Sequence, residues 1–156
     1  MSNAFYKVPP AKNEPILGYK SGSAEKLELK NALKKFMGQK KDIPMHIGGK
    51  EVRTDKLMPL SPPHNHKHII GQYHKGDASH VKQAIEAALK AKHDWSNMPW
   101  EQRASIFLKA ADLMAGPYRA AMNAATMIGQ SKNVFQAEID CVCELVDFFR
   151  FNVQFM

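Results

Sequence analysis

The sequence lacks any long apolar run. No stretch approaches the roughly 20 consecutive apolar residues that a membrane-spanning helix needs. The first fifteen residues have neither the apolar core of a secretory signal nor the Arg- and Ser-rich composition of a transit peptide. We therefore expect a cytoplasmic protein without a membrane partner.

Cysteine is scarce. The two cysteines of the chain, Cys141 and Cys143, are two residues apart in a segment that we predict to be helical. On a helix they point about 200° apart, so we expect them neither to pair nor to share a metal ion. This cysteine usage is typical of a reducing compartment.

The common catalytic motifs are also missing. The sequence has no GxGxxG or P-loop glycine pattern for phosphates, no HExxH metal motif and no GxSxG nucleophile motif. His64, His66 and His68 alternate, and on a strand they would share one face and suit zinc. Because no Asp, Glu or Cys lies beside them to orient the imidazoles, we expect a solvated loop and no metal ligand among them.

The chain is basic, with a net charge of +7 and a pI near 9.4. The Lys residues are spread along the chain, and aromatic residues do not alternate with them as they do in a nucleic-acid stacking surface. We therefore expect no nucleic-acid partner. Two interpretations remain: a small basic helical interaction module, or a basic piece of a larger protein whose remainder balances the charge.

Composition divides the 156 residues into three segments. Residues 1–22 are rich in Pro and Gly and predict an extended N-terminal arm. Residues 23–75 predict a helix, capped by Ser23, followed by short strands. Residues 76–156 predict four consecutive helices. The strands are too few for a complete sheet, so we expect a mainly helical part of an α/β fold.

Glycine and proline mark the turns of the strand region. Gly48 and Gly49 predict a two-residue turn in a hairpin over residues 43–53. Residues 58–65 predict a Pro-rich loop, and residues 66–74 predict a further strand in which Gly71 permits a bulge or a close backbone approach.

Apolar residues recur at helical spacing in the last half of the chain. Asp77 or Ser79 is expected to cap the first of these helices, and Pro99 precedes the second. The first helix is expected to bury one apolar face, formed by Val81, Ile85, Ala88 and Leu89.

The last segment, residues 131–155, contains neither Pro nor Gly, and we predict one long helix. Glu138 lies in the middle of its apolar face. A carboxylate there must pair, shift its pKa or serve a site. It could serve a functional site, lie at the rim of that face, or pair with an arginine or a backbone amide in a packed core.

Several segments resemble the 1-pyrroline-5-carboxylate dehydrogenases of the aldehyde dehydrogenase superfamily. They are NEPILGY, GSAEKLELKNALK, SPPHNHKHIIGQYHKGD, the run from Ala84 through Arg103 to Leu113, and MIGQSKNVFQAEIDCVCELVDFFRFNV. They agree in order and spacing from about Asn13 onward, which covers nearly the whole chain.

The resemblance implies the helical N-terminal part of an aldehyde dehydrogenase fold, with residues 76–156 a layer of an incomplete NAD-binding domain. It implies an NAD-dependent enzyme that oxidises L-glutamate γ-semialdehyde to glutamate in proline degradation. The catalytic cysteine and the NAD-binding residues would lie beyond this chain, so we expect the chain alone to be inactive and to bind no NAD. Among its own residues, Glu138 would bind substrate.

The resemblance further implies that the rest of the enzyme is the main partner, that the complete protein is a homo-oligomer, and that a eukaryotic form resides in the mitochondrial matrix.

Overall fold

The computed structural model describes residues 5–156. The arm residues 5–20 contain neither helix nor strand, and residues 1–4 of the predicted arm lie outside the described part. The elements follow in chain order: α1 (Ala24–Gly38), β1 (Lys41–Ile43), β2 (Met45–Ile47), β3 (Lys50–Val52), β4 (Leu57–Leu60), β5 (Gly71–His74), α2 (Ala78–Asn97), α3 (Trp100–Ala115), α4 (Arg119–Gln130), α5 (Val134–Ala137), the π-helix η1 (Glu138–Cys143) and α6 (Glu144–Phe155).

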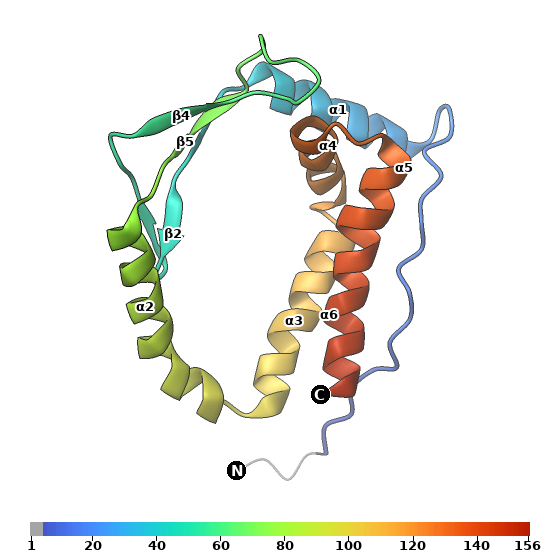
Figure 1. The fold of residues 1–156 in the computed structure, drawn as a ribbon. Helices are drawn as coiled ribbons and strands as arrows, with labels where there is room; N and C mark the ends of the chain where they lie inside the picture. Colours follow the sequence, from blue (N-terminus) through green and yellow to red (C-terminus); the bar gives the residue numbers. More distant parts are fainter. Residues whose placement is uncertain (1–4) are drawn as a thin grey trace.

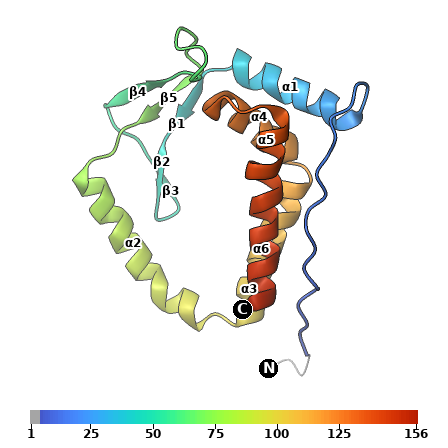
Figure 2. The same ribbon diagram turned by 45° about the vertical axis from the view of Figure 1, so that its right-hand side comes forward.

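The elements form an open ring (Figures 1 and 2). The strands and α2 make one side, and α3, α4 and α6 make the other. The two sides are joined at one end by α1 and at the other end by the connection from α2 to α3. The arm runs along the outer side of α6. In the described part of the chain, no helix is long and apolar enough to cross a membrane.

Two small groups of buried side chains hold the helical side together. The first joins the arm, α1 and α4 through Tyr19, Leu29 and Ala124. The second joins α3 to the last helix through Ala111, Val142 and Val146. Alanine at the contact allows the two helices to approach closely, which explains why a sequence with few bulky core residues still packs here.

The predicted hairpin is confirmed. β2 and β3 pair antiparallel across Gly48 and Gly49, which have φ values of 59° and 77°. Positive φ at both central residues gives a turn whose twist matches that of the flanking strands.

The three-stranded sheet differs from the prediction in two places. It has the order β1-β5-β4, with β1 parallel and β4 antiparallel to β5. The loop predicted over residues 58–65 was partly wrong, because Leu57–Leu60 form an edge strand, where Pro59 is tolerated. The strand predicted over residues 66–74 is shorter, because only Gly71–His74 pair.

Gly71, the first residue of β5, lies very close to the neighbouring strand. A Cβ atom on Gly71 would collide with the backbone carbonyl of Lys41 on the neighbouring strand. The close backbone approach predicted for this glycine is therefore confirmed.

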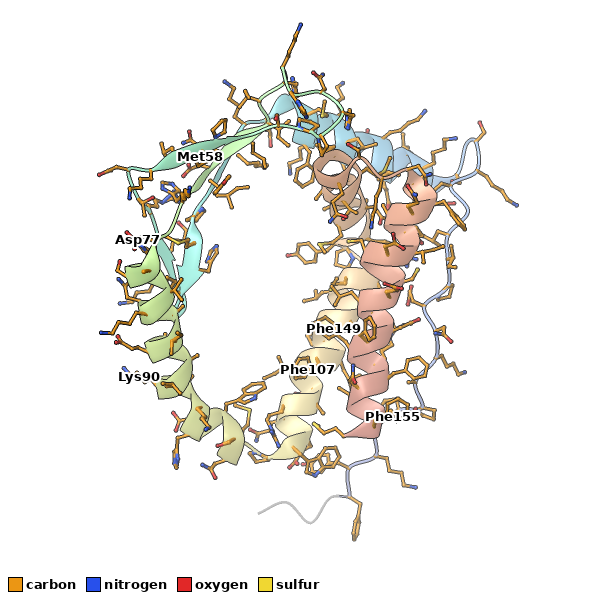
Figure 3. All side chains as sticks on the ribbon, in the orientation of Figure 1. Met58, Asp77, Lys90, Phe107, Phe149 and Phe155 are labelled. Carbon is orange, nitrogen blue, oxygen red and sulfur yellow. The ribbon has the colours of Figure 1, made fainter. Side chains whose placement is uncertain are left out.

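The burial predicted for α2 was wrong. Asp77 caps the helix as expected, but no residue of α2 is buried, and Val81, Ile85 and Leu89 are each more than half exposed. Their face is apolar, yet no described element covers it. In Figure 3 the helix stands apart from α3 and α6.

The helix predicted over residues 131–155 is confirmed from Val134 to Phe155, but residues 131–133 lie outside it and it is not regular. It starts at Val134, behind a capping box between Asn133 and Gln136, and continues to Phe155. Residues Glu138–Cys143 form a π-helix within it. A π turn inserts one residue into the helical repeat, and such insertions are frequent at functional sites.

Candidate functional site

The candidate site is built around Glu138, the first residue of the π-helix. Its side chain is fully buried, although it carries a charge and lies at the end of the α5 turn. The neighbouring Ala137 and Val142 are also fully buried. The residue thus lies inside the packed region, as its place on the apolar face predicted.

Five N–H and O–H donor atoms of four residues bond to the two carboxylate oxygens. Oε1 accepts hydrogen bonds from the Leu17 amide at 2.8 Å and from Arg119 Nε at 3.1 Å. It also accepts a hydrogen bond from Arg119 Nη2. Oε2 accepts from the Tyr19 hydroxyl and from Asn123 Nδ2, both at 2.7 Å. A carboxylate has about four lone-pair positions, so its hydrogen-bonding capacity is filled.

Arg119 joins this carboxylate to the arm. Its Nη1 donates to Glu14 Oε1 at 2.6 Å, and its Nη2 donates to the Pro15 carbonyl at 2.7 Å. The other oxygen of Glu14 accepts from Arg150 Nη1 of α6 at 2.6 Å. Arg150, Glu14, Arg119 and Glu138 therefore form a row in which guanidinium and carboxylate groups alternate. The row joins the arm, α4 and the last helix. We call Glu14, Tyr19, Arg119, Asn123 and Glu138 the Glu138 cluster.

The electrostatics favour the ionised form of Glu138. Burial by itself raises its pKa, but hydrogen bonds from Arg119, Leu17, Tyr19 and Asn123 outweigh burial and lower the pKa below the ordinary value of 4.5. Burial also opposes the charge of Arg119, yet bonds to Glu138 and Glu14 raise its pKa. Each charge is thus stabilised by the other.

Two further groups at the site are held neutral. Burial, followed by the hydrogen bond and charge of Glu138, raises the pKa of the Tyr19 hydroxyl. Burial and the charge of Glu138 raise the pKa of the Cys143 thiol to about 11. At neutral pH both groups therefore remain protonated, and Cys143 is a poor nucleophile.

The two cysteines lie in different surroundings. Cys143 is buried, with its sulfur 3.5 Å from Arg119 Nη2 and 3.9 Å from the Pro15 carbonyl. Cys141 is half-buried, and its thiol lies 3.8 Å from the Met122 carbonyl. Both thiols are free, in agreement with the prediction that they do not pair.

Of the alternatives for Glu138, the packed core is confirmed, because Glu138 pairs with an arginine and a backbone amide there. Substrate binding by Glu138 stays a prediction. Within the described residues, its oxygens are occupied by the chain itself.

The partners of Glu138 were not found from the sequence. They lie 15 to 121 residues away along the chain. One signal was present: Arg119 and Asn123 are four residues apart in a segment otherwise rich in Ala and Met, so they share one helix face. Polar residues repeated on an apolar face indicate a buried polar contact.

The alternating histidines do not share a strand. His64 lies in a turn and contacts Ser131 Oγ at 2.8 Å, while His68 contacts the Met37 carbonyl at 3.1 Å. The geometric premise for a shared zinc site was therefore wrong. Across residues 5–156, no group of three or more metal-ligating side chains is found.

An apolar groove lies between α3 and α6. It is lined by Phe107, Phe148, Phe149, Asn152, Val153 and Met156. Phe107 and Phe149 face each other, with ring centroids 5.7 Å apart, and Figure 3 shows both between the two helices. Phe148 is more than half exposed.

Comparison with known proteins identifies the family. The family model of the aldehyde dehydrogenase family matches residues 51–156. Delta-1-pyrroline-5-carboxylate dehydrogenase of Agaricus bisporus is 47% identical over 154 residues, which cover 98% of this chain and 28% of the relative. The mitochondrial enzyme of Mus musculus is 46% identical over 143 residues, which cover 92% of this chain and 25% of the relative.

Solved structures agree with the sequence comparison. The NAD-bound Delta-pyrroline-5-carboxylate dehydrogenase of Mycobacterium tuberculosis superimposes with a TM-score of 0.95 at 43% identity, over 99% of this chain and 29% of that one. The 1-pyrroline-5-carboxylate dehydrogenase from Thermus with bound NAD gives a TM-score of 0.85 at 29% identity, over 96% of this chain and 28% of that one. The chain spans little more than a quarter of the length of these relatives. It belongs to the aldehyde dehydrogenase family and has the mainly helical fold predicted for the N-terminal part of that family.

Proposed function

We propose that this chain is part of an NAD-dependent 1-pyrroline-5-carboxylate dehydrogenase, which oxidises L-glutamate γ-semialdehyde to glutamate in proline degradation. The observation that carries the proposal is the match, at a TM-score of 0.95 and 43% identity, to an NAD-bound enzyme of that name over 99% of this chain. Both sequence and backbone agree along the chain, whereas a shared fold alone would not indicate the substrate.

The reaction needs a thiolate to attack the aldehyde and NAD to accept the hydride. Neither cysteine of this chain suits the first task. Cys143 is buried with its pKa raised to about 11, and Cys141 lies mid-helix against a carbonyl. We assign the nucleophile to the part of the relatives that this chain does not span.

The described residues do not fit a dinucleotide. In a nucleotide-binding βα unit, the phosphates lie at the N-terminus of the helix after a strand. Here the helix that follows β5 is capped by Asp77, whose carboxylate accepts hydrogen bonds from the Ser79 amide at 2.9 Å and the His80 amide. This negative charge occupies the amides that a pyrophosphate would use and would repel it. We assign NAD binding to the remainder of the enzyme.

The contribution of this chain is therefore a framework. The exposed apolar face of α2, formed by Val81, Ile85 and Leu89, supports an interface with the remainder of the enzyme, because large uncovered apolar faces mark interaction sites. We also propose that the complete protein is a homo-oligomer and is cytoplasmic, or lies in the mitochondrial matrix in a eukaryote. The name of the mouse relative describes that protein as mitochondrial.

The test compares the complete enzyme that we propose with the 156-residue chain. NADH formation from glutamate semialdehyde is followed by its absorbance. We expect activity in the complete protein and none in the chain alone. Activity of the chain alone, or a complete protein that oxidises other aldehydes but not this one, would contradict the proposal. Cys141→Ser and Cys143→Ser in the complete protein serve as controls and should remain active.

The predicted role of Glu138 in substrate binding has its own test. Glu138→Ala in the complete protein should raise KM or lower kcat if the carboxylate orients substrate. A loss of thermal stability with unchanged kinetic constants would instead assign Glu138 to the packing of the arm alone.

A further inference from the structure

The arm is attached to the helices through side chains. The Ala11 amide donates to Gln154 Oε1 at 2.6 Å, and the Glu14 amide donates to Asp147 Oδ1 at 2.6 Å. The Leu17 amide donates to Glu138 Oε1 at 2.8 Å. Residues 11–19, which we call the latch segment, thus lie on the helices without extending a helix or a sheet (Figure 1).

The latch segment has fewer buried side chains than the helices beneath it. Tyr19 is buried, Leu17 is partly buried against the same cluster, and the Glu14 side chain is 10% exposed, whereas Lys12, Pro15 and Ile16 are exposed. Segments with few buried apolar contacts open locally at a lower free-energy cost than the core. Lifting these residues would break the ion pairs of Glu14 with Arg119 and Arg150 and the two hydrogen bonds to Glu138. It would also release the side chains of Tyr19 and Leu17 from the cluster that they form with α1 and α4.

Tyr19 is held in a strained backbone conformation. Its φ of 47° lies in the left-handed region, which bulky residues rarely adopt. The hydroxyl bonds to Glu138 and Asn123 secure the ring in this position. Opening of the segment would relieve the backbone strain, which further lowers the cost of opening.

The latch segment covers a carboxylate and a thiol. Glu138 is fully buried, Cys143 is 5% exposed, and the sulfur of Cys143 lies 3.9 Å from the Pro15 carbonyl. Two of the five N–H and O–H donors to Glu138, the Leu17 amide and the Tyr19 hydroxyl, belong to the latch segment. Its departure would free acceptor sites on the carboxylate and expose the thiol together.

We propose that residues 11–19 are a latch that opens while α4, η1 and α6 stay folded, and that its opening controls the access of other molecules to Glu138 and Cys143. In the closed state, donors of the chain itself occupy the Glu138 carboxylate. In the open state, the carboxylate can bind an outside donor such as an ammonium group. The link to substrate rests on the proposed function, whereas the latch itself does not.

Thiol labelling tests the latch. Two backgrounds of the 156-residue chain, Cys141→Ser and Cys143→Ser, report on one thiol each, with a small aromatic disulfide as the probe. Tyr19→Phe removes one bond to Glu138, and Tyr118→Phe at an exposed position is the matched control. Because a hydrogen bond to a charged group is lost, we expect Tyr19→Phe to speed labelling of Cys143 about tenfold or more. Labelling of Cys141 should not change, and Tyr118→Phe should have no effect.

Hydrogen exchange of the unmodified chain gives a second measurement that needs no variant. The Leu17 amide should exchange faster than the Val146 amide in the core of α6, and its exchange should follow the labelling rate of Cys143. Equal exchange of the two amides would mean that the arm lifts only on global unfolding, and would overturn the latch. Faster labelling of both Cys141 and Cys143 in the Tyr19→Phe variant would also overturn the latch. Since neither assay uses NAD or an aldehyde, failure here is distinct from failure of the proposed enzyme activity.

Discussion

Replacement of Arg119 by methionine tests whether the Glu138 cluster stabilises the fold. Arg119 has a side chain that is 9% exposed, and its partner Glu138 is fully buried. Methionine keeps the apolar stem but removes the donors to Glu138, Glu14 and Pro15. Removing one partner of a buried ion pair leaves the other charge uncompensated, which typically costs about 3–5 kcal/mol.

A surface ion pair gives the matched control. Arg53 bonds to Asp42 and Glu51 with its side chain 48% exposed. Because solvent screens such pairs, Arg53→Met should cost at most about 1 kcal/mol. Urea denaturation followed by far-ultraviolet circular dichroism gives both free energies of unfolding.

A double variant separates the charge from the packing. Arg119→Met combined with Glu138→Met removes both charges, so it should be less destabilising than Arg119→Met alone, because no unpaired charge remains. If Arg119→Met and Arg53→Met cost the same, or if the double variant costs the sum of its parts, the reasoning about the buried pair is refuted.

Three further changes follow from the structure. Acid should destabilise the chain, because the pKa of Glu138 is lowered in the fold. The stabilisation that the ionised Glu138 provides is present above the ordinary pKa of 4.5 and is lost as pH falls through the lowered pKa. Glu138→Gln should flatten this part of the curve of unfolding free energy against pH, measured by urea titration from neutral to acid pH. Gly71→Ala should lower the free energy of unfolding by about 1–3 kcal/mol or more, because the new Cβ would collide with the carbonyl of Lys41. A variant with unchanged Tm would contradict that geometry. The uncovered apolar face of α2 should make the isolated chain self-associate, and Ile85→Ser with Leu89→Ser should reduce that association in sedimentation velocity. The same double change should alter the free energy of unfolding by no more than about 0.5 kcal/mol, and a large loss of stability would show that α2 is packed in solution.

Local chemistry made parts of the fold predictable. Gly48 and Gly49 predicted the hairpin because a two-residue turn needs positive φ at both positions. Asp77 and Ser79 were the two candidate caps for the start of α2, and the structure shows Asp77, whose carboxylate satisfies the first amides of the helix. Both signals depend on residues that are adjacent in the sequence, so no tertiary information was needed.

Burial was predicted less well because it depends on what lies opposite. Val81, Ile85 and Leu89 have the spacing of a buried face, but no described element covers them. The same limit applies to the strand predicted over residues 66–74. Only its last four residues have a partner strand in register, and pairing is decided by the neighbour.

For the candidate site, the sequence by itself determined that Glu138 lies on the apolar face of a long helix, because helical periodicity fixes which side chains share a face. The resemblance of the segments from Asn13 onward also indicated the family, which the comparisons confirm. Only the tertiary structure decided how the charge is accommodated. The donors come from Leu17, Tyr19, Arg119 and Asn123, and chain folding alone brings these distant residues to one carboxylate.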